Sequence, residues 1–444
     1  MPSQGTIGDR VRGLRLNRRM SQAQLAGPDL SDSYVSLIES GKRTPTPVVA
    51  RLLAERLGCT TEFLLHGIEP RQRIDTELGL RHAELELQHG DPAVAADRYS
   101  EIVKAADEEN AMLTAQARFG RARALEAQGR LGQAVEAFER LRREAAAHPE
   151  RLADLPITIA LSRCYQRAGD RLRARDLASK ALEQAERMSI MQGELAVELA
   201  CALVEAHGEQ RGSSPELAYV KRVLDIAGLS DVMDRSGEVR ALWKASSAAA
   251  AGEDSALAVR LADDAINAGR DCRVALQLAR AAMRWARLEW TPTAEAERLA
   301  SDAARTFASA GRDQERGEAL IALSRVMLRA GEPERAGDLA GEALGLLGGG
   351  SVAAEAHLVR ATVAVMREAD PADHLTAARI VLEGTAGQPY GADRATAKCW
   401  RELGDLFGRT GDRSQQTAAY RKALEAAGVR SIMAGLTVDT AIAR

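Results

Sequence analysis

The first 66 residues of the chain carry apolar residues at helical spacing, with frequent polar interruptions. Ile7, Val11 and Leu14 lie three or four residues apart, which is the spacing of one face of a helix. The same spacing, broken by polar and glycine-containing segments, predicts four further short helices. The five predicted helices span 7–19, 22–26, 32–40, 46–57 and 61–66. We therefore expect a small all-helical domain here.

Polar residues mark the ends of the second and third of these helices. Ser21 and Gln24 have the spacing of a capping box, in which each side chain satisfies a free backbone N–H. Ser31 fits the N-cap of the next helix, and Gly41 fits a left-handed C-cap. Between the two helices, Gly27-Pro28-Asp29 predicts a tight turn. Two short helices joined in this way form a helix-turn-helix.

A second pattern follows: an apolar helix, a turn with Gly or Pro, and a helix with Ala spaced by three and four. Its turns recur about every 40 residues, which is typical of a solenoid of helix pairs. The predicted turns lie at 90–91, 129–130, 169–170, 208–209, 252–253, 291–292, 331–332, 370–371 and 411–412. We therefore expect a helix-turn-helix domain over 1–69, a linker over 70–74, about nine helix pairs over 75–430, and a cap or tail over 431–444.

The composition favours an all-α protein. Hydrophobic residues make up 45% of the 444, which is enough for a core, but aromatic residues are only 3%, too few for a sandwich or barrel. The net charge of −3 gives no sign that the chain as a whole binds nucleic acid or membrane. The five cysteines are scattered, and there is no signal peptide or long uncharged apolar run. These features predict a reduced, cytoplasmic protein without a membrane segment.

The N-terminal part, through its segment 20–59 above all, resembles the DNA-binding domain of the phage-repressor-like regulators called the XRE family. The resemblance covers about 60 residues and is carried by Ser21-Gln22, Leu25-Ala26, Val35, Ile38-Glu39, Gly41, Pro45, Leu52-Leu53 and Leu57-Gly58. The turn departs from the family pattern, because Gly27-Pro28-Asp29-Leu30 stands where an apolar residue and a glycine are usual. In such a domain the second helix of the motif enters the major groove of double-stranded DNA.

This docking geometry and the resemblance predict the DNA contacts. Asp32, Ser33 and Ser36 are candidates for reading bases, and Leu37 could touch a thymine methyl group. Asp32 fits equally well as a first-turn acid that complements the helix dipole. Glu39 is expected to pair with a nearby arginine. The remaining predicted contacts are Gln22, Arg18, Arg19, Lys42 and Arg43 at phosphates, Ser31 at the helix start, and Tyr34, which could instead pack half-buried.

A homodimer follows from the small size of the predicted DNA-binding domain. Residues 1–69 hold nine Lys or Arg against seven Asp or Glu, so their charge alone supports DNA binding only weakly. One such domain covers little DNA, and useful affinity needs two copies on half-sites about one helical turn apart. We expect the rest of the chain to hold the two copies together.

The helix pairs resemble tetratricopeptide repeats lengthened from the usual period of about 34 residues. The clearest copy is the last, with Trp400, Leu403, Gly404, Phe407, Gly411 and Tyr420. The resemblance implies a right-handed α-solenoid whose first helices line a concave side. Aligning the turns predicts effector contacts by Gln116, Phe119, Arg123, Arg163, Gln166, Trp285, Arg325, Lys398 and Arg401. Their basic groups suit a carboxylate or phosphate and their rings suit stacking, but the arginines could instead pair within the solenoid.

The two-part layout resembles the peptide-responsive regulators of Gram-positive bacteria, which implies a peptide, small-molecule or protein effector. Side-chain amides suit peptide backbones, and the chain has only three asparagines, which favours an anionic metabolite or a protein over a peptide. No catalytic or metal-binding motif is visible, so we expect no enzyme activity and no cofactor. Two alternatives stay open: a protein-binding scaffold without a small effector, and an enzyme-modulating solenoid whose helix-turn-helix no longer binds DNA.

Overall fold

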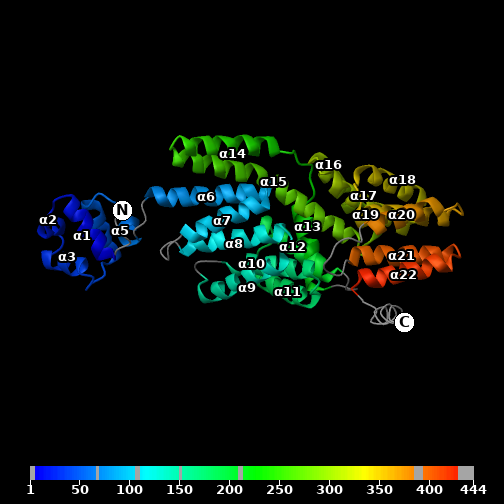
Figure 1. Ribbon diagram of the computed structural model, residues 1–444, viewed down its shortest axis with the longest axis horizontal. Helices are drawn as coiled ribbons and strands as arrows, with labels where there is room; N and C mark the ends of the chain where they lie inside the picture. The colour runs from blue at the N-terminus through cyan, green and yellow to red at the C-terminus, as the bar shows by residue number, and fades with distance from the viewer. Residues whose placement is uncertain are drawn as a thin grey trace, which may run out of the picture. The chain divides into compact units, whose positions relative to one another are not determined.

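A computed structural model of the chain describes residues 6–66, 70–105, 111–149, 153–208, 214–384 and 394–428. These residues form 22 α-helices and no strand, which confirms the prediction of an all-α protein (Figure 1). The predicted cap or tail, 431–444, lies outside the described residues. The chain divides into two compact units, which are treated separately below. Unit 1 holds Met1–Ala153 and Ser236–Ala268, and unit 2 holds Asp154–Arg235 and Gly269–Arg444.

Five short helices begin unit 1, close to the predicted bounds. They are α1 (Ile7–Asn17), α2 (Gln22–Ala26), α3 (Asp32–Glu39), α4 (Pro47–Arg56) and α5 (Thr61–His66). Val35 and Ile38 of α3 are 0% and 1% exposed and belong to one core with Val11 of α1. Gly8 lets α1 approach α3 closely, because a Cβ at this position would lie 2.4 Å from the carbonyl oxygen of Ile38. The result is a compact base from which the outer face of α3 projects.

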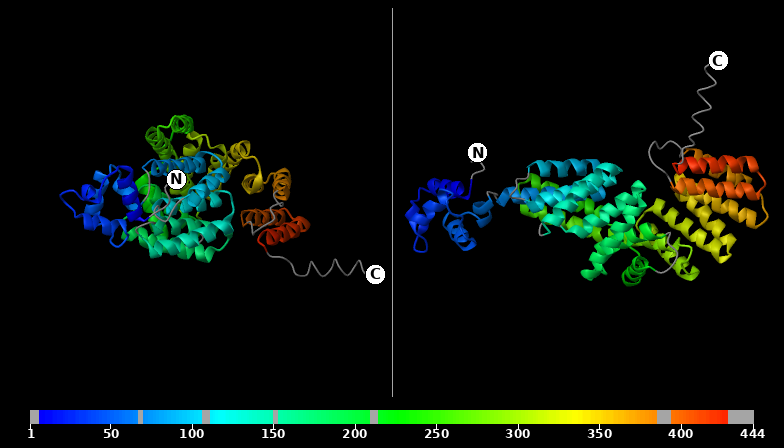
Figure 2. Two further views of the ribbon diagram at one scale, coloured as in Figure 1. Left: turned by 60° about the vertical axis from the view of Figure 1, so that its left-hand side comes forward. Right: turned by 90° about the horizontal axis from the view of Figure 1, so that it is seen from below.

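The helices after α5 follow one another as packed pairs (Figure 1 and Figure 2). In unit 1 they are α6 (Pro70–His89), α7 (Pro92–Ala105), α8 (Ala111–Ala127), α9 (Leu131–Ala147), α14 (Ser236–Ala251) and the first part of α15 (Ser255–Ala286). Segments far apart in the sequence meet in this unit, since Leu85 of α6 shares a core with Val239 of α14 and Ala262 of α15.

Unit 2 contains the other pairs. Its helices are α10 (Asp154–Ala168), α11 (Arg171–Arg187), α12 (Glu194–His207), α13 (Pro215–Ala227), the rest of α15, α16 (Thr293–Ser309), α17 (Asp313–Ala330), α18 (Pro333–Leu346), α19 (Gly350–Met366), α20 (Ala372–Gly384), α21 (Arg394–Arg409) and α22 (Arg413–Ala426). None of the described helices has the length and apolar character that a bilayer span requires.

Two predicted boundaries are wrong. Residues 70–74 are not a linker, because α6 begins at Pro70, and proline suits the first turn of a helix, where its missing N–H is not needed. The prediction of nine separate pairs also fails at α15, a single helix of 32 residues that serves where two helices were expected. Its interior contains one glycine, Gly269, and no proline. A single glycine costs a helix only about 1 kcal/mol, so the helix continues through it.

Small buried residues at fixed positions hold the two helices of a pair together. Three serines donate a hydrogen bond to a carbonyl oxygen 12 residues later, in the second helix of their pair. The bonds are Ser162 to Ala174 (2.8 Å), Ser246 to Ala258 (2.6 Å) and Ser324 to Ala336 (2.6 Å). In the pair α8–α9 the same two positions hold Ala122 and Ala134, both 0% exposed. A larger side chain at either position would push the helices apart. The pairs therefore share small residues at two equivalent positions, 12 residues apart, in addition to the repeat period.

The turns within the pairs use the left-handed backbone conformation. Gly129, Gly169, Gly331 and Gly411 have φ of 75°, 87°, 80° and 87°. At the corresponding turns of two other pairs, Glu253 and Glu368 have φ of 62° and 56°. This conformation costs residues with a side chain roughly 1–2 kcal/mol, whereas glycine adopts it freely. Two of these six turns within pairs therefore carry backbone strain that the other four avoid.

Candidate DNA-binding surface and effector site

The outer face of α3 consists of the residues predicted to read bases. The exposed positions are Asp32, Ser33, Ser36 and Leu37. The opposite face is anchored in the core by Val35 and Ile38. The carboxylate of Asp32 accepts a hydrogen bond from the backbone N–H of Ser33 at 2.9 Å, as a first-turn acid does. Ser33 and Ser36 are exposed, so their hydroxyls are accessible as donors or acceptors.

Basic side chains border this face. Ser31 caps α3, since its hydroxyl accepts a hydrogen bond from the backbone N–H of Tyr34 at 3.1 Å. The ring of Tyr34 is half-buried, and the guanidinium of Arg43 lies over it, 5.2 Å from the ring centroid. This cation–π contact holds a cation from the following loop against α3. Lys42 is exposed, and its side chain bonds to none of the described residues.

A buried ion pair fixes α2 against α3. The two side chains of Arg15 and Glu39 are 11% and 5% exposed and are joined by hydrogen bonds of 2.5 and 2.9 Å. The amide nitrogen of Gln22, the first residue of α2, donates to the same carboxylate at 2.8 Å. Burial raises the pKa of Glu39, but the hydrogen bonds from Arg15 and Gln22 outweigh it and hold the pKa below its usual value. The expected pairing of Glu39 is present, whereas the phosphate contact of Gln22 stays a prediction.

The unusual turn between α2 and α3 is held by Arg56, which no sequence pattern points to. Its guanidinium donates to the carbonyl oxygens of Leu25, at 3.1 Å, and Ala26, and it pairs with Asp29. Gly27 has φ of 52°, and a Cβ there would lie 2.8 Å from the guanidinium carbon. Residue 56 lies on α4, about thirty positions from the turn, so only the fold brings them together. Arg56 thereby fixes the direction of α3 relative to α2.

The arginines between 10 and 19 do not form one uniform basic surface. Arg10 donates to the carbonyl oxygens of Leu64 and Leu65 at 3.0 and 2.7 Å, and so holds the end of α5. Arg18 is exposed and donates to the carbonyl oxygen of Gly58 at 3.4 Å. Arg19 is exposed with a left-handed φ of 54°. The phosphate contacts predicted for Arg18 and Arg19 stay predictions.

Comparison with known families identifies this N-terminal part. Residues 11–64 match the helix-turn-helix family. The match begins in α1 and ends in α5, so the helix-turn-helix domain that the sequence predicts is confirmed. No curated protein matches the chain.

Several solved structures align along most of the chain. The apo form of the quorum sensor NprR from B. thuringiensis is 11% identical, with 95% of this chain and 99% of that chain covered and a TM-score of 0.47. A Rap protein complexed with competence and sporulation factor is 11% identical, with 95% and 97% covered and a TM-score of 0.41. Bacillus thuringiensis PlcR in complex with the peptide PapR7 and DNA is 10% identical, with 93% and 98% covered and a TM-score of 0.29. At sequence identities of 10–11% and TM-scores below 0.5, what these proteins bind is said of them alone.

In unit 1, the predicted effector residues are largely engaged. Arg123 pairs with Glu84 of α6 at 3.0 Å. The ring of Phe119 makes an edge contact with Phe138, with 5.9 Å between ring centroids. Gln116 is exposed on α8. Arg123 therefore follows the alternative in which the arginines pair within the solenoid.

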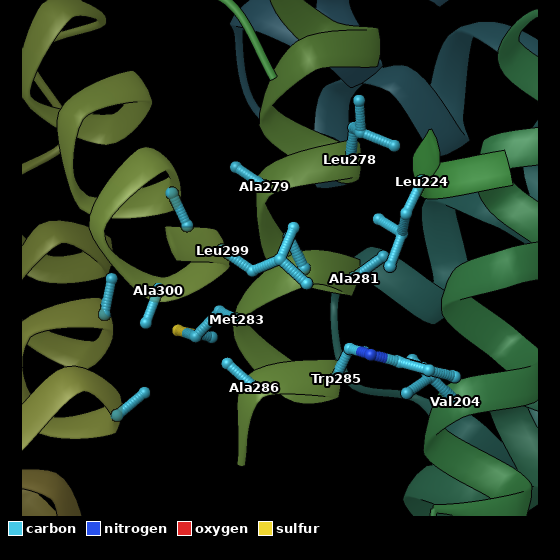
Figure 3. Packing of buried hydrophobic residues seen from close by; sticks show 14 of the residues in the cluster. Val204, Leu224, Leu278, Ala279, Ala281, Met283, Trp285, Ala286, Leu299 and Ala300 are labelled. Atoms are coloured by element: carbon cyan, nitrogen blue, oxygen red, sulfur yellow. The ribbon is translucent and has the colours of Figure 1, made fainter. Parts of the chain in front are cut away.

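In unit 2, Trp285 does not offer a ring to a ligand. It is 3% exposed and packs in the core beside Val204 and Leu224 (Figure 3). Its indole nitrogen donates to Glu295 at 3.3 Å. The prediction for Trp285 is wrong. It assumed that each first helix runs up to its turn, so that positions counted back from the turn are equivalent in all repeats. α15 ends at Ala286, well before the turn at 291–292, whereas α17 ends directly before its turn, so the alignment was shifted along α15.

Arg325, the next predicted residue, lies in a network of carboxylates. It pairs with Glu402 at 2.5 and 2.7 Å and with Glu355 at 3.2 Å. Glu355 also pairs with Arg287 at 2.5 Å. Burial raises the pKa of Glu355, but the charges of Arg287 and Arg325 outweigh it and lower the pKa to about 2. The guanidinium of Arg325 thus already has carboxylate partners within unit 2, and these replace the anionic ligand that was predicted for it.

The other predicted residues of unit 2 differ in how open they are. Gln166 donates its amide to the carbonyl oxygen of Glu205 at 3.1 Å, and its own buried oxygen has no hydrogen-bond partner in the described part of the chain. Arg163, also on α10, is half-buried and already engaged. Lys398 and Arg401 are exposed on α21 and pair with none of the described residues. They remain the open cations of the predicted set.

Charged residues of five helices continue the network around Arg325. Arg284 pairs with Glu205 at 2.5 Å, and Arg280 pairs with Glu315 at 3.1 Å. We call the whole set the charged stripe; its members are Glu205, Arg280, Arg284, Arg287, Glu315, Glu318, Arg325, Glu355 and Glu402. Only Arg325 was predicted, because most of these partners lie one or two repeats apart in the sequence. Over the described ranges, no three His, Cys, Asp or Glu are placed to hold a metal ion.

Proposed function

We propose that the chain is a sequence-specific DNA-binding transcriptional regulator that acts as a dimer and responds to an effector bound by its helical repeat. The observation that carries the proposal is the outer face of α3. Ser33 and Ser36 are exposed there, and Lys42 and Arg43 follow in the next loop. Hydroxyls can read base edges in the major groove, and cations neutralise the phosphates that flank it.

The contacts behind α3 support the same role. Arg56 fixes the turn, and the group of Arg15, Gln22 and Glu39 ties α2 to α3. The two helices therefore form one rigid unit that can dock without rearranging, which keeps the cost of ordering low on binding.

The repeat supplies the regulated part of the proposal. A ligand changes DNA binding only if it favours one state of the protein over another, and coupling energies of about 1–3 kcal/mol are usual. The charged stripe joins helices that are far apart in the sequence, so a ligand bound there contacts several helix pairs at once. The alternatives without DNA binding or without an effector are outcomes of the experiments below.

Binding-site selection from random duplex DNA tests the DNA-binding proposal. We expect the wild-type chain to enrich one half-site. The double variant Ser33→Ala/Ser36→Ala should change which bases are preferred, because the reading groups are lost. Lys42→Ala should weaken binding to all duplexes by a similar factor and reduce the slope of log affinity against log salt by about 1.

The outcome that contradicts the proposal is equally clear. A chain that enriches no sequence, and whose affinity barely depends on salt, has lost DNA binding, since about 6–10 phosphate contacts give a steep dependence. Changed preference in Lys42→Ala with none in the serine variant would show that α3 does not read the bases.

A further inference from the structure

Glu318, on α17, lies within the charged stripe without a partner. It is half-buried and makes no hydrogen bond or ion pair with the residues that the structure describes. Three arginines act on its charge: Arg280, Arg284 and Arg287. Their side chains are 38%, 37% and 32% exposed, so solvent and solutes can reach this part of the stripe.

Each of these arginines is already committed to another carboxylate. Arg280 pairs with Glu315 at 3.1 Å, Arg284 with Glu205 at 2.5 Å, and Arg287 with Glu355 at 2.5 Å. A half-buried carboxylate without a partner is unfavourable, because it has lost water without gaining an ion pair. Burial and the neighbouring Glu315 raise the pKa of Glu318, and the three arginines offset this only in part.

Two buried side-chain oxygens belong to residues next to members of the stripe, in sequence or through a hydrogen bond. Gln277 precedes Arg280 by three residues, on the same face of α15, and its buried side-chain oxygen has no hydrogen-bond partner among the residues that the structure describes. Gln166 bonds to the backbone of Glu205, the residue that pairs with Arg284, and its side-chain oxygen is also buried without a partner. The stripe holds five carboxylates and four guanidinium groups, and Glu318 is the carboxylate that pairs with none of them among the described residues.

We propose that the charged stripe binds a ligand through an amine or guanidinium group that pairs with Glu318. The proposal rests on the effector function proposed above and names the chemical class of the effector. The charge of this ligand is opposite to that of the carboxylate or phosphate ligand that the sequence predicts. A cation supplies the partner that Glu318 lacks, whereas an anion beside Glu318 would add negative charge where carboxylates already outnumber guanidinium groups.

Binding of agmatine to the full chain, measured by calorimetry and by thermal unfolding without DNA, tests this. Agmatine carries both a guanidinium and an amine, and we expect it to bind and to raise the unfolding temperature by mass action. Glu318→Gln keeps the size of the side chain and removes its charge. We expect this variant to bind agmatine about tenfold more weakly, as loss of a charge-assisted hydrogen bond predicts.

Two controls make the outcome decisive. Glu383→Gln removes an exposed carboxylate of α20, outside the stripe, that pairs with none of the described residues, and it should leave agmatine binding unchanged. Inorganic phosphate at the same ionic strength should stabilise the chain less than agmatine does. The proposal is overturned if agmatine does not bind, if Glu318→Gln binds it as well as the wild type, or if phosphate stabilises more. None of these results bears on DNA binding, which the selection experiment tests separately.

Discussion

Arg15 and Glu39 illustrate how much one pair of residues controls in the helix-turn-helix domain. Glu39→Gln would leave Arg15, only 11% exposed, without its countercharge. We expect the local free energy of opening of α3 to fall by about 3 kcal/mol, because breaking a buried pair strands a charge. Hydrogen exchange of the α3 amides in the full chain measures this.

The same pair sets a pH dependence. The folded-state pKa of Glu39 lies below its usual 4.5, so its contribution is fully present above that value and is lost as the pH falls toward the lowered pKa. The gap between wild type and Glu39→Gln should therefore shrink below about pH 4.5. Glu55→Gln, which changes an exposed acid of α4, should show neither effect. A gap that stayed constant with pH would contradict the assignment.

Residues that act over short sequence distances were predictable. The capping box of Ser21 and Gln24 forms as its three-residue spacing predicts, and Ser31 caps α3. Arg56 and Glu318 were not predictable, since the role of each depends on residues brought near by the fold. Trp285 shows the complementary error: a repeat alignment placed it on a ligand face, but its ring lies in the core.

At the scale of helices and turns, backbone conformation gives a direct test. Glu368 has φ of 56° in an exposed turn, and Glu368→Gly should raise the unfolding free energy of its helix pair by about 1 kcal/mol, since glycine adopts this conformation without strain. Gly331→Ala is the matched reverse change, because a Cβ there meets nothing within 4 Å and only the backbone is affected. It should lower stability by a similar amount. Hydrogen exchange of the flanking helices measures both, and equal effects of the same sign would contradict the account.

Most helix ends were predictable because caps, glycines and prolines are local signals. The nine predicted turns all fall between helices or in segments outside the described residues. The continuous helix α15 was not predictable from the repeat period. The period does not show whether the last helix of one pair and the first helix of the next pair are separated by a loop, and without a strong helix breaker the two can join into one helix. The sequence between Ser255 and Ala286 contains no proline, and that is why the helix persists.

At the scale of the whole molecule, the proposed DNA binding predicts a stoichiometry. One helix-turn-helix domain contacts only part of a helical turn of DNA, so we expect two chains on a duplex with two half-sites about one turn apart. Light scattering of the complex measures the stoichiometry. Moving one half-site by five base pairs places it on the opposite side of the duplex and should weaken binding, whereas moving it by a full turn should weaken it less. One chain per duplex at undiminished affinity would contradict a dimer.

The overall plan of the molecule was predictable, but the chemistry of its repeat was not. Period and composition predict helix pairs, and these are present. Whether the proposed site favours a cation or an anion depends on which charged groups remain unpaired after folding. Arg325 pairs with Glu402, whereas Glu318 pairs with none of the described residues. A net charge of −3 for 444 residues carries no information about that balance.

The buried hydroxyls of Ser162, Ser246 and Ser324 have a consequence for the ancestry of the chain. Packing alone requires only a small residue at this position, and Ala122 satisfies it in another pair. A hydroxyl making the same bond across the same interval in three pairs is therefore a surplus feature, of the kind that copying preserves. Duplication of one helix pair would produce this shared bond, with alanine replacing serine in pairs such as α8–α9.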